Sequence, residues 1–346
     1  MKRLRVFIIA ILATTGWWSV VGQNTTATDK VAEKRVNPIV ASVVEWAPQA
    51  PCFSNPPIDW DKPDLKILDI GNSYTVDAQA YVDRLAKAAG LEANYSLYTA
   101  YRGGGSFKNW VDIYHNRDTK HYRVYKCSGT ELEGVGGNAE AGDGELFRQT
   151  ITNTKWDIIL IHQVSVYSND FSLWDGHGRG GYLNELIEIL RRTNPQASIG
   201  YLMIHSYKAD WRDNTEGNSL KRWINIAGST KQFMESYGID FVIPYGTAVQ
   251  NLRATSLCDH NEFSNDGTHL ANGLGDYVAS CCYFQALFGP RFGVSIMGNT
   301  YRQTDLDESL PGVLNITDET APIAQKAAVL AVSNMWQVRN PEEWEF

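Results

Sequence analysis

Apolar and polar residues alternate along this chain in blocks typical of buried strands followed by helices. Short apolar runs bounded by Gly, Pro or Asn predict strands, and apolar positions three or four residues apart predict helices. The predicted strands cover residues 65–71, 93–99, 156–162, 197–204 and 240–244. The predicted helices cover residues 78–89, 107–115, 183–192, 219–237, 270–288 and 321–338. This alternation predicts an α/β domain with a mostly parallel sheet and helices on both faces.

The domain organisation follows from where this pattern starts and where it is interrupted. We find no internal repeat and no linker after residue 62, so residues 63–346 are expected to form a single domain. Residues 117–143 contain several glycines and a strand-like run, which predicts an inserted loop or hairpin. Residues 289–346 form a C-terminal extension beyond the predicted helix 270–288.

The N-terminal residues have the composition of a targeting segment. Basic residues precede an apolar run over 6–13, and small residues follow near position 22, so residues 1–22 are expected to be a cleaved signal peptide. An uncleaved membrane anchor is the alternative, because residues 6–22 are barely long enough to span a bilayer. Residues 23–62 are rich in Thr, Asn and Pro and are interpreted as an extended lead-in. Cleavage predicts a periplasmic or secreted protein without stable membrane insertion.

Composition and charge narrow the classes of function. A chain of 346 residues with 43% hydrophobic and 20% charged residues is typical of a globular protein. The net charge of −8 argues against nucleic acid as a partner, because phosphate binding requires a basic surface. The 11 Trp and 17 Tyr indicate either a well-filled core or aromatic faces that stack on sugars.

The five cysteines do not have the spacing of a metal site. They contain no C-x-x-C pair and no His at zinc spacing. In an oxidising compartment we expect Cys258 to pair with Cys281 or Cys282, and Cys52 to pair with Cys127.

Candidate chemistry lies directly after the predicted strands, where parallel sheets bind their ligands. Ser73 follows the first strand and precedes a helix, so its hydroxyl is either a nucleophile or a helix cap. Asp266 and His269 are three residues apart in a turn that enters a helix. The carboxylate there can orient the imidazole toward a nucleophile, although a helix cap and a surface histidine are the alternative.

Two further segments offer hydrogen-bond donors. The glycines 103–105 let backbone N–H groups approach a ligand closely, and the side-chain amide of Gln163 follows the third strand. The ordinary alternatives are a flexible turn and an interior amide.

Together these blocks resemble those of the SGNH (GDSL-like) hydrolases. The matching segments are Gly71-Asn72-Ser73-Tyr74-Thr75, the Gly-rich second block, the amide after the third strand, and Asp266-Gly267-Thr268-His269-Leu270. The resemblance covers residues 65 to about 288. It implies a flavodoxin-like, three-layer α/β/α fold with a five-stranded, mostly parallel sheet.

The resemblance also implies roles for individual residues. Ser73 corresponds to the nucleophile, His269 to the general base and acid, and Asp266 to the residue that orients His269. The implied oxyanion hole combines the N–H groups of Ser73 and Gly104 with the side chain of Gln163. The register among Gly103, Gly104 and Gly105 stays open.

The chain departs from the common family pattern at two positions. Asn72 replaces the usual Asp, and Gln163 replaces the usual Asn. The run His162-Gln163-Val164-Ser165 is more similar to the sialate O-acetylesterase-like and uncharacterised secreted branches than to lipolytic ones.

Loop residues beyond the strand ends are candidates for substrate binding. The expected set is Tyr74, Arg102, His162, Trp174, His205 and Trp211, with Tyr101, Tyr167 and His177 as further loop candidates. The mechanism that the family resemblance implies requires no cofactor and no metal. The hypothesis is a secreted serine esterase that removes acetyl or similar small acyl groups from carbohydrate. The alternatives are a non-catalytic glycan-binding protein on the same fold and an acyltransferase that uses the same triad.

Overall fold

A computed structural model of the protein describes residues 64–175, 181–258 and 261–344. The predicted signal peptide over 1–22 and the lead-in over 23–62 lie outside the described residues, as do Cys52 and His177. Among the helices that the structure describes, none has both the length and the hydropathy needed to cross a membrane.

The centre of the fold is one seven-stranded sheet with the order β4-β3-β2-β1-β5-β6-β7. Neighbouring strands from β2 to β7 in this order pair in parallel, and β3 and β4 add an antiparallel extension beside β2. The strands are β1 (Leu65–Gly71), β2 (Tyr95–Tyr101), β3 (Tyr122–Gly129), β4 (Gly137–Ala139), β5 (Ile158–Ile161), β6 (Ser198–Leu202) and β7 (Phe241–Ile243). The parallel part has the flavodoxin-like order 2-1-3-4-5.

The predicted sheet of five strands is therefore right for the parallel part and two strands short. Both additional strands come from residues 117–143, where the sequence predicts a loop or hairpin insertion. The insertion pairs with β2 because the outer edge of β2 would otherwise carry unpaired backbone groups.

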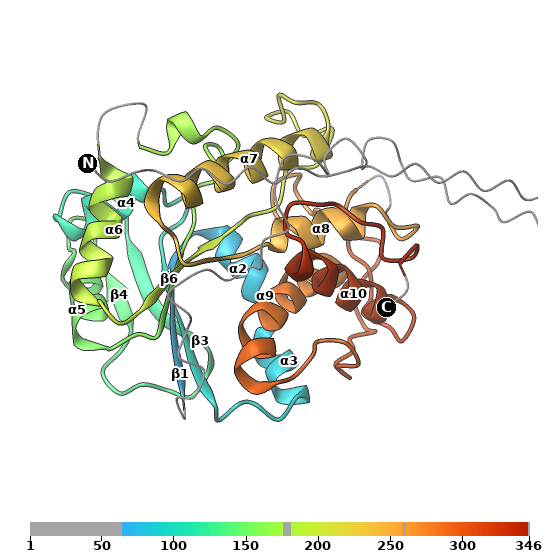
Figure 1. The fold of residues 1–346 in the computed structure, drawn as a ribbon, viewed down its shortest axis with the longest axis horizontal. Helices are drawn as coiled ribbons and strands as arrows, with labels where there is room; N and C mark the ends of the chain where they lie inside the picture. The colour runs from blue at the N-terminus through green and yellow to red at the C-terminus, as the bar shows by residue number, and fades with distance from the viewer. Residues whose placement is uncertain (1–63, 176–180, 259–260, 345–346) are drawn as a thin grey trace, which may run out of the picture. The chain divides into compact units, whose positions relative to one another are not determined.

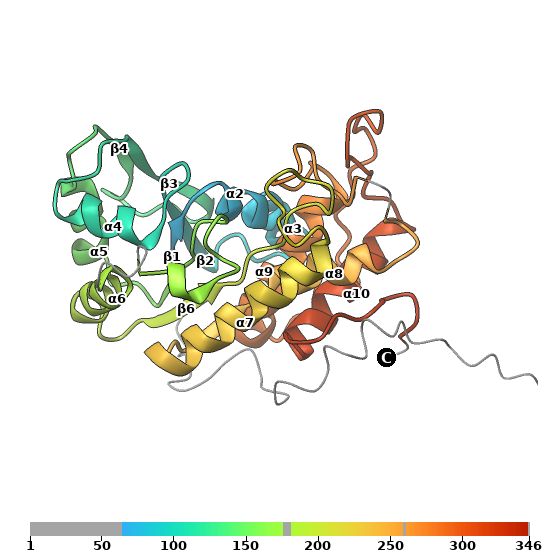
Figure 2. The same ribbon diagram turned by 90° about the horizontal axis from the view of Figure 1, so that it is seen from above.

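Helices cover both faces of the sheet (Figures 1 and 2). One face packs against α2 (Ser73–Gln79), α3 (Val82–Ala88), α8 (Tyr245–Arg253) and α9 (Leu274–Phe292), and α10 (Thr320–Ser333) packs on α8 and α9. The other packs against α4 (Phe107–Tyr114), α5 (Glu145–Asn153), α6 (Tyr182–Thr193) and α7 (Ser219–Tyr237). Two buried apolar clusters, one on each side of the sheet, form the core, and the three-layer prediction is confirmed.

The helix boundaries differ from the sequence prediction in three places. The predicted helix over 78–89 is two helices, α2 and α3, because the chain turns between Gln79 and Val82. Helix α5 follows the inserted hairpin, where no helix was expected. Helix α8 was also not predicted, because all nine of its residues are buried, the polar Gln250 and Asn251 included, so its polar positions do not mark an exposed face.

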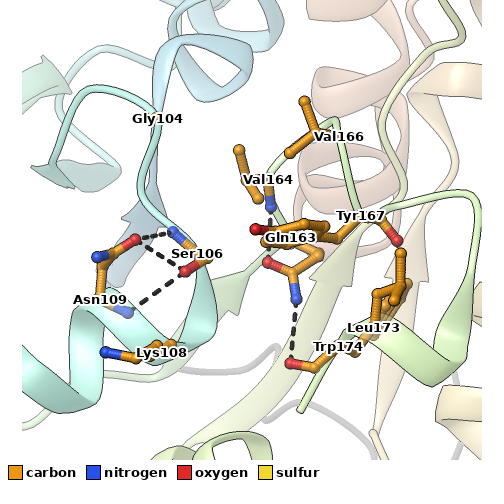
Figure 3. A pocket seen from close by; sticks show the side chains of 10 residues that line it. All are labelled: Gly104, Ser106, Lys108, Asn109, Gln163, Val164, Val166, Tyr167, Leu173 and Trp174. Atoms are coloured by element: carbon orange, nitrogen blue, oxygen red, sulfur yellow. Dashed lines mark hydrogen bonds between the residues drawn. The ribbon is translucent and has the colours of Figure 1, made fainter. Parts of the chain in front are cut away.

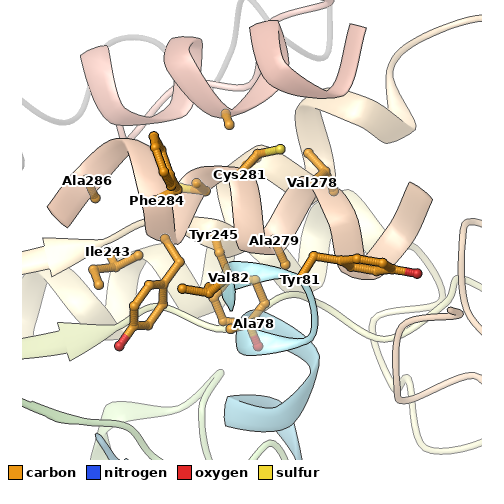
Figure 4. Close-up of a cluster of buried hydrophobic side chains, with 14 of the residues drawn as sticks. Ala78, Tyr81, Val82, Ile243, Tyr245, Val278, Ala279, Cys281, Phe284 and Ala286 are labelled. Atoms are coloured by element: carbon orange, nitrogen blue, oxygen red, sulfur yellow. The ribbon is translucent and has the colours of Figure 1, made fainter. Parts of the chain in front are cut away.

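The predicted disulfide between Cys258 and either Cys281 or Cys282 does not form, and Cys127, Cys258, Cys281 and Cys282 are not joined in disulfides. Cys281 and Cys282 are fully buried on α9, and Figure 4 shows Cys281 within the apolar packing around this helix. Burial raises the pKa of the Cys281 thiol well above its ordinary value. The prediction was wrong because these thiols fill the core as small apolar side chains.

A buried polar group links β1 to the helix that follows it. Asp69 is fully buried and accepts hydrogen bonds from Gln79 Nε2 (3.1 Å) and Thr75 Oγ1 (3.4 Å). Thr99 on β2 donates in turn to Gln79 Oε1 (2.7 Å). Burial raises the pKa of Asp69 from 3.8 to about 8, against the opposing effect of the bonds from Thr75 and Gln79. Asp69 is therefore protonated at neutral pH.

We predict that Asp69→Asn changes the pH dependence of stability. The folded state holds a proton on Asp69 up to about pH 8, whereas the unfolded chain releases it near pH 4. The contribution of Asp69 to the free energy of unfolding is complete below pH 4 and is lost as the pH rises toward 8. Asn cannot titrate, so the free energy of unfolding of the variant relative to wild type should increase between pH 5 and pH 8.5. Urea unfolding at both pH values measures this, and an equal difference at both would contradict it.

Candidate active site

Ser73 begins α2 at the carboxyl end of the central strand β1. Asn72 adopts an extended conformation (φ −138°), and its side-chain oxygen caps the helix by accepting the N–H of Tyr74 at 3.0 Å. An Asn cap of this kind contributes about 1 kcal/mol to helix stability. The amide of the same side chain donates to Gly105 O at 2.8 Å, which ties the turn after β1 to the glycine loop after β2.

The structure brings together the three residues that the sequence assigns to catalysis. Ser73 Oγ lies 2.8 Å from His269 Nε2, and His269 Nδ1 lies 2.7 Å from Asp266 Oδ2. Ser73 and His269 are only partly buried, so this chain of hydrogen bonds is open to an incoming ligand. The geometry allows His269 to take the proton of Ser73 while Asp266 fixes the orientation of the imidazole ring.

Asp266 is held in its ionised form by its own turn. Its Oδ1 accepts the backbone N–H groups of His269 (2.7 Å) and Thr268 (2.8 Å) and the hydroxyl of Thr268 (2.9 Å). Partial burial raises the pKa of Asp266, but these bonds and the bond from the His269 ring outweigh it and hold the pKa well below its ordinary range. The carboxylate is therefore available to stabilise an imidazolium.

Tyr74 and His205, both expected to bind substrate, instead hold the loop that carries His269. The Tyr74 hydroxyl donates to Thr268 O at 2.8 Å, and His205 Nε2 lies 2.8 Å from the same oxygen. The two rings stack with their centroids 4.7 Å apart, and both side chains are almost fully buried. We call Tyr74, His205 and the Thr268 carbonyl the clasp. The expectation was wrong because these polar groups point inward, to each other and to backbone.

His162 is likewise buried beneath the site and does not line it. Its Nε2 accepts the backbone N–H of Asn72 (3.2 Å) and lies 2.7 Å from Thr75 Oγ1. Burial lowers the pKa of His162 to about 4, so the ring is neutral and Nε2 can serve as an acceptor. His162 thus supports the backbone directly before Ser73 and is too deep to meet a substrate.

Arg102 stabilises the glycine loop from behind. Its guanidinium is buried and pairs with Asp118 (3.0 Å), so it is not free to bind substrate as expected. It also donates to the carbonyl oxygens of Gly103 (3.1 Å) and Gly104 (3.3 Å). Gly104 is exposed and has a positive φ of 64°, a conformation that favours glycine. The loop is therefore fixed with Gly104 at the surface.

Gln163 does not supply the side-chain donor expected of it. Its Nε2 donates to Trp174 O (3.2 Å) and its Oε1 accepts the N–H of Val164 (2.8 Å). Trp174 is also occupied, because its buried indole donates to Tyr167 O at 2.9 Å. Both side chains are therefore used to build the wall of the site.

A cavity of about 550 Å³ opens beside Gly104 (Figure 3). Its walls come from the start of α4, the loop after β5 and the short helix η1 (Phe171–Leu173). The lining residues are Gly104, Ser106, Lys108, Asn109, Gln163, Val164, Val166, Tyr167, Leu173 and Trp174. The cavity is thus continuous with the proposed oxyanion glycine and has both polar and apolar walls.

Trp211, the last of the expected substrate-binding residues, packs on the turn between Asp266 and His269. A Cβ on Gly267 would lie 2.3 Å from its ring, so the indole covers this glycine closely. Trp211 is half-buried and contacts the core. The indole of Trp211 therefore covers the turn and packs against the core.

Asp77, on α2, is a functional candidate that the sequence reasoning missed. It lies one helical turn after Ser73, and its Oδ2 accepts the N–H of Leu270, the residue after His269, at 3.2 Å. Burial raises the pKa of Asp77 to about 7, the imidazole of His269 and the Leu270 bond oppose this rise, and the charge of Asp266 adds to it. The spacing of four residues from Ser73 was the available signal.

Within the described residues, no group of three or more His, Cys, Asp or Glu side chains could hold a metal ion.

The sequence of residues 66–315 matches the model of a domain of unknown function, DUF4886. The chain belongs to the DUF4886 family. A solved DUF4886 structure from Bacteroides uniformis shares the fold, with a TM-score of 0.65 and 24% identity over 82% of this chain and 100% of that one. A comparison with curated proteins finds no match.

Weaker likenesses to solved carbohydrate esterases are also found. A carbohydrate esterase family 3 structure from Talaromyces cellulolyticus gives a TM-score of 0.40 at 14% identity, covering 67% of this chain and 100% of that one. A family 3 carbohydrate esterase from Clostridium thermocellum gives 0.39 at 12% identity, covering 66% and 98%. The flavodoxin-like strand order, with all four sequence blocks at one edge of the sheet, agrees with the SGNH-like relationship expected from those blocks.

We predict that Tyr74→Phe slows the reaction of Ser73 with a fluorophosphonate about tenfold. The variant keeps the stacked ring but loses one of two donors to the Thr268 carbonyl, a loss of about 1 kcal/mol in the position of His269. Tyr98→Phe is the matched control, because it removes a buried hydroxyl that accepts the N–H of Leu132 and lies in the middle of β2 on the α4 face of the sheet. Equal labelling rates for the two variants would contradict the clasp.

Asp77→Asn should alter the pH dependence of the same labelling reaction. Asp77 ionises near pH 7, and its carboxylate then favours the imidazolium that His269 becomes when it takes the Ser73 proton. Asn keeps an acceptor for Leu270 but has no charge. The ratio of wild-type to variant labelling rates should therefore rise as the pH increases through about 7, as measured by labelling between pH 5 and 9. A ratio independent of pH would contradict it.

Proposed function

We propose that this DUF4886 protein is a secreted serine esterase that hydrolyses acetyl or similar small acyl esters on carbohydrate. The observation that carries the proposal is the hydrogen-bonded chain from Ser73 through His269 to Asp266, with Oγ–Nε2 and Nδ1–Oδ2 distances of 2.8 and 2.7 Å. Secretion rests on the signal-like residues 1–22 and is part of the proposal.

In the proposed mechanism, Ser73 Oγ attacks the ester carbonyl while His269 Nε2 takes its proton. Asp266, ionised and bonded to Nδ1, stabilises the imidazolium that forms. His269 then donates the proton to the departing sugar oxygen, which leaves an acyl group on Ser73. Water attacks this acyl-enzyme with His269 as the base, and Ser73 regains its proton.

Two backbone N–H groups are proposed to stabilise the oxyanion. Ser73 is the first residue of α2, so helix geometry leaves its N–H without a partner in the helix. The exposed Gly104, held by Arg102, supplies the second donor. Gln163 has no direct part, because its amide supports Trp174. A fixed donor at this position contributes roughly 3 kcal/mol to transition-state stabilisation in related chemistry.

The cavity beside Gly104 gives room for part of the substrate. The polar side chains of α4 that reach it are already engaged, Lys108 with Asp112 and Asn109 with Asp118 and Ser106. Tyr167 and the exposed Val166 line the opposite wall. A substrate there therefore meets apolar side chains, the form of contact that acyl methyl groups and the apolar faces of sugars make.

Replacement of the nucleophile tests the proposal. Ser73→Ala should lower the hydrolysis of p-nitrophenyl acetate, and the release of acetate from acetylated xylo-oligosaccharide, by at least about a thousandfold. Ser309→Ala, which alters an exposed serine in the segment between α9 and α10, is the matched control and should retain wild-type rates. Undiminished hydrolysis by Ser73→Ala would exclude the mechanism. Hydrolysis of p-nitrophenyl acetate without release of acetate from the xylo-oligosaccharide would exclude acetylated xylan as the substrate.

A further inference from the structure

The inserted hairpin of β3 and β4 brings a new set of side chains next to the nucleophile turn. Gly71, two residues before Ser73, pairs with Tyr101 on β2, and Tyr101 pairs with Arg123 on β3. Neighbouring strands are about 4.8 Å apart, so the backbone of Arg123 lies roughly 10 Å from that of Gly71. The insertion thus extends the edge of the sheet that carries the site.

Arg123 projects on the same face of the sheet as α2. Its neighbours Tyr122 and Val124 belong to the core cluster on the α4 face, and alternate residues of a strand point to opposite faces. Arg123 and Tyr125 therefore point to the α2 face. In agreement, Tyr125 and the exposed Val76 of α2 line a common hollow.

The Arg123 guanidinium lies over two aromatic rings. It lies 5.1 Å from the ring centroid of Tyr101 and 4.8 Å from that of Tyr125. A guanidinium that rests on aromatic rings keeps its in-plane N–H groups for other partners. No described residue accepts a hydrogen bond from Arg123 or forms an ion pair with it, although its side chain is exposed. Arg102, which follows β2 and so lies one strand nearer to Ser73, is by contrast engaged by Asp118.

A hollow of about 480 Å³ opens at this guanidinium, lined by Tyr101, His121, Tyr122, Arg123, Asn138, Ala139 and Glu140. The carboxylate in the hollow, Glu140, turns to His121, whose Nδ1 lies 3.1 Å away. Within this hollow, Glu140 is therefore paired with His121, and Arg123 has no carboxylate partner among the described residues. Tyrosine faces and edges, an amide and a guanidinium together form the kind of lining that binds a sugar ring.

We propose that this hollow is a subsite for a carboxylate-bearing sugar, such as a uronic acid, of the glycan whose ester reaches Ser73. The planar guanidinium of Arg123 binds the sugar carboxylate through two parallel N–H···O bonds, and Tyr101 contacts the ring. The inference rests on the proposed esterase function and names its substrate as an acidic oligosaccharide. It gives the inserted hairpin a role in substrate choice.

The test compares two substrates that differ only in the carboxylate. O-acetylated α-1,4-trigalacturonate and the matching O-acetylated trigalactoside carry a carboxylate or a hydroxymethyl group at the same carbon. The wild-type protein should prefer the acidic substrate in kcat/KM by about tenfold or more, and Arg123→Gln should abolish this preference. Lys120→Gln, which removes one exposed positive charge three residues away, should keep it. Glu140→Gln should keep or increase it, because the variant removes a repulsive carboxylate from the hollow.

Direct binding separates this inference from the proposed function. Trigalacturonate without acetyl groups is titrated calorimetrically into wild-type protein and into Arg123→Gln, and the variant should bind at least about tenfold more weakly. Tight binding by wild type alone would uphold the subsite even if neither acetylated substrate were hydrolysed, in which case only the esterase function fails. Equal binding by the two proteins, or equal kcat/KM for the two substrates in wild type, would overturn the subsite.

Discussion

The candidate active site depends on how closely the turn after β1 packs onto His162. A Cβ on Gly71 would lie 2.1 Å from both His162 Nε2 and Thr75 Oγ1, so only glycine permits the chain to pass here. This contact lets His162 accept the N–H of Asn72 and lets Asn72 cap α2, which fixes Ser73 at the first position of the helix. A larger residue at Gly71 would move Ser73 away from His269.

The groups that support this turn are buried in their neutral forms. Burial keeps the His162 ring unprotonated, with a pKa of about 4, and keeps Asp69 protonated, with a pKa of about 8. Neutral donors and acceptors can be buried at lower cost than charges, and each here has a partner that also fixes the backbone. The ionised Asp266 lies instead in an exposed turn, where water shares its charge. The charge needed for chemistry is therefore kept away from the polar groups that hold the fold.

The sequence was sufficient to predict the site residues whose position follows from the order of strands and helices along the chain. Parallel strands place their carboxyl ends at one edge, so Ser73 and His269 could be expected to meet despite a sequence separation of 196 residues, and they do. The sequence did not predict which side chains are buried beneath the site and which line it. Tyr74, His162 and His205 follow strands as substrate-binding residues do, but whether a side chain points to the cleft or beneath it depends on three-dimensional packing. Arg102 misled for a similar reason, since its partner Asp118 lies in the insertion, whose path the sequence left open.

The register of the insertion was beyond prediction for a related reason. An antiparallel strand that is added at an edge can slide by two residues without exposing its apolar face, so the pattern alone does not pair Arg123 with Tyr101. The β-bulge between Leu97 and Tyr98 shifts this pairing further. Arg123 therefore went unnoticed as a candidate, whereas Tyr101 was included because it directly precedes the glycine loop.

The clasp has a consequence for how the site moves. Tyr74 is the neighbour of Ser73 in the chain, and Thr268 is the neighbour of His269, so the bond from Tyr74 to the Thr268 carbonyl couples the two backbones one residue away from the reacting atoms. When α2 shifts, it carries the His269 turn with it. The distance between Ser73 Oγ and His269 Nε2 is then insensitive to small motions of the sheet or of distant loops. Sequence changes in the surrounding segments, including an inserted hairpin such as β3–β4, can then leave the geometry of Ser73 and His269 unchanged.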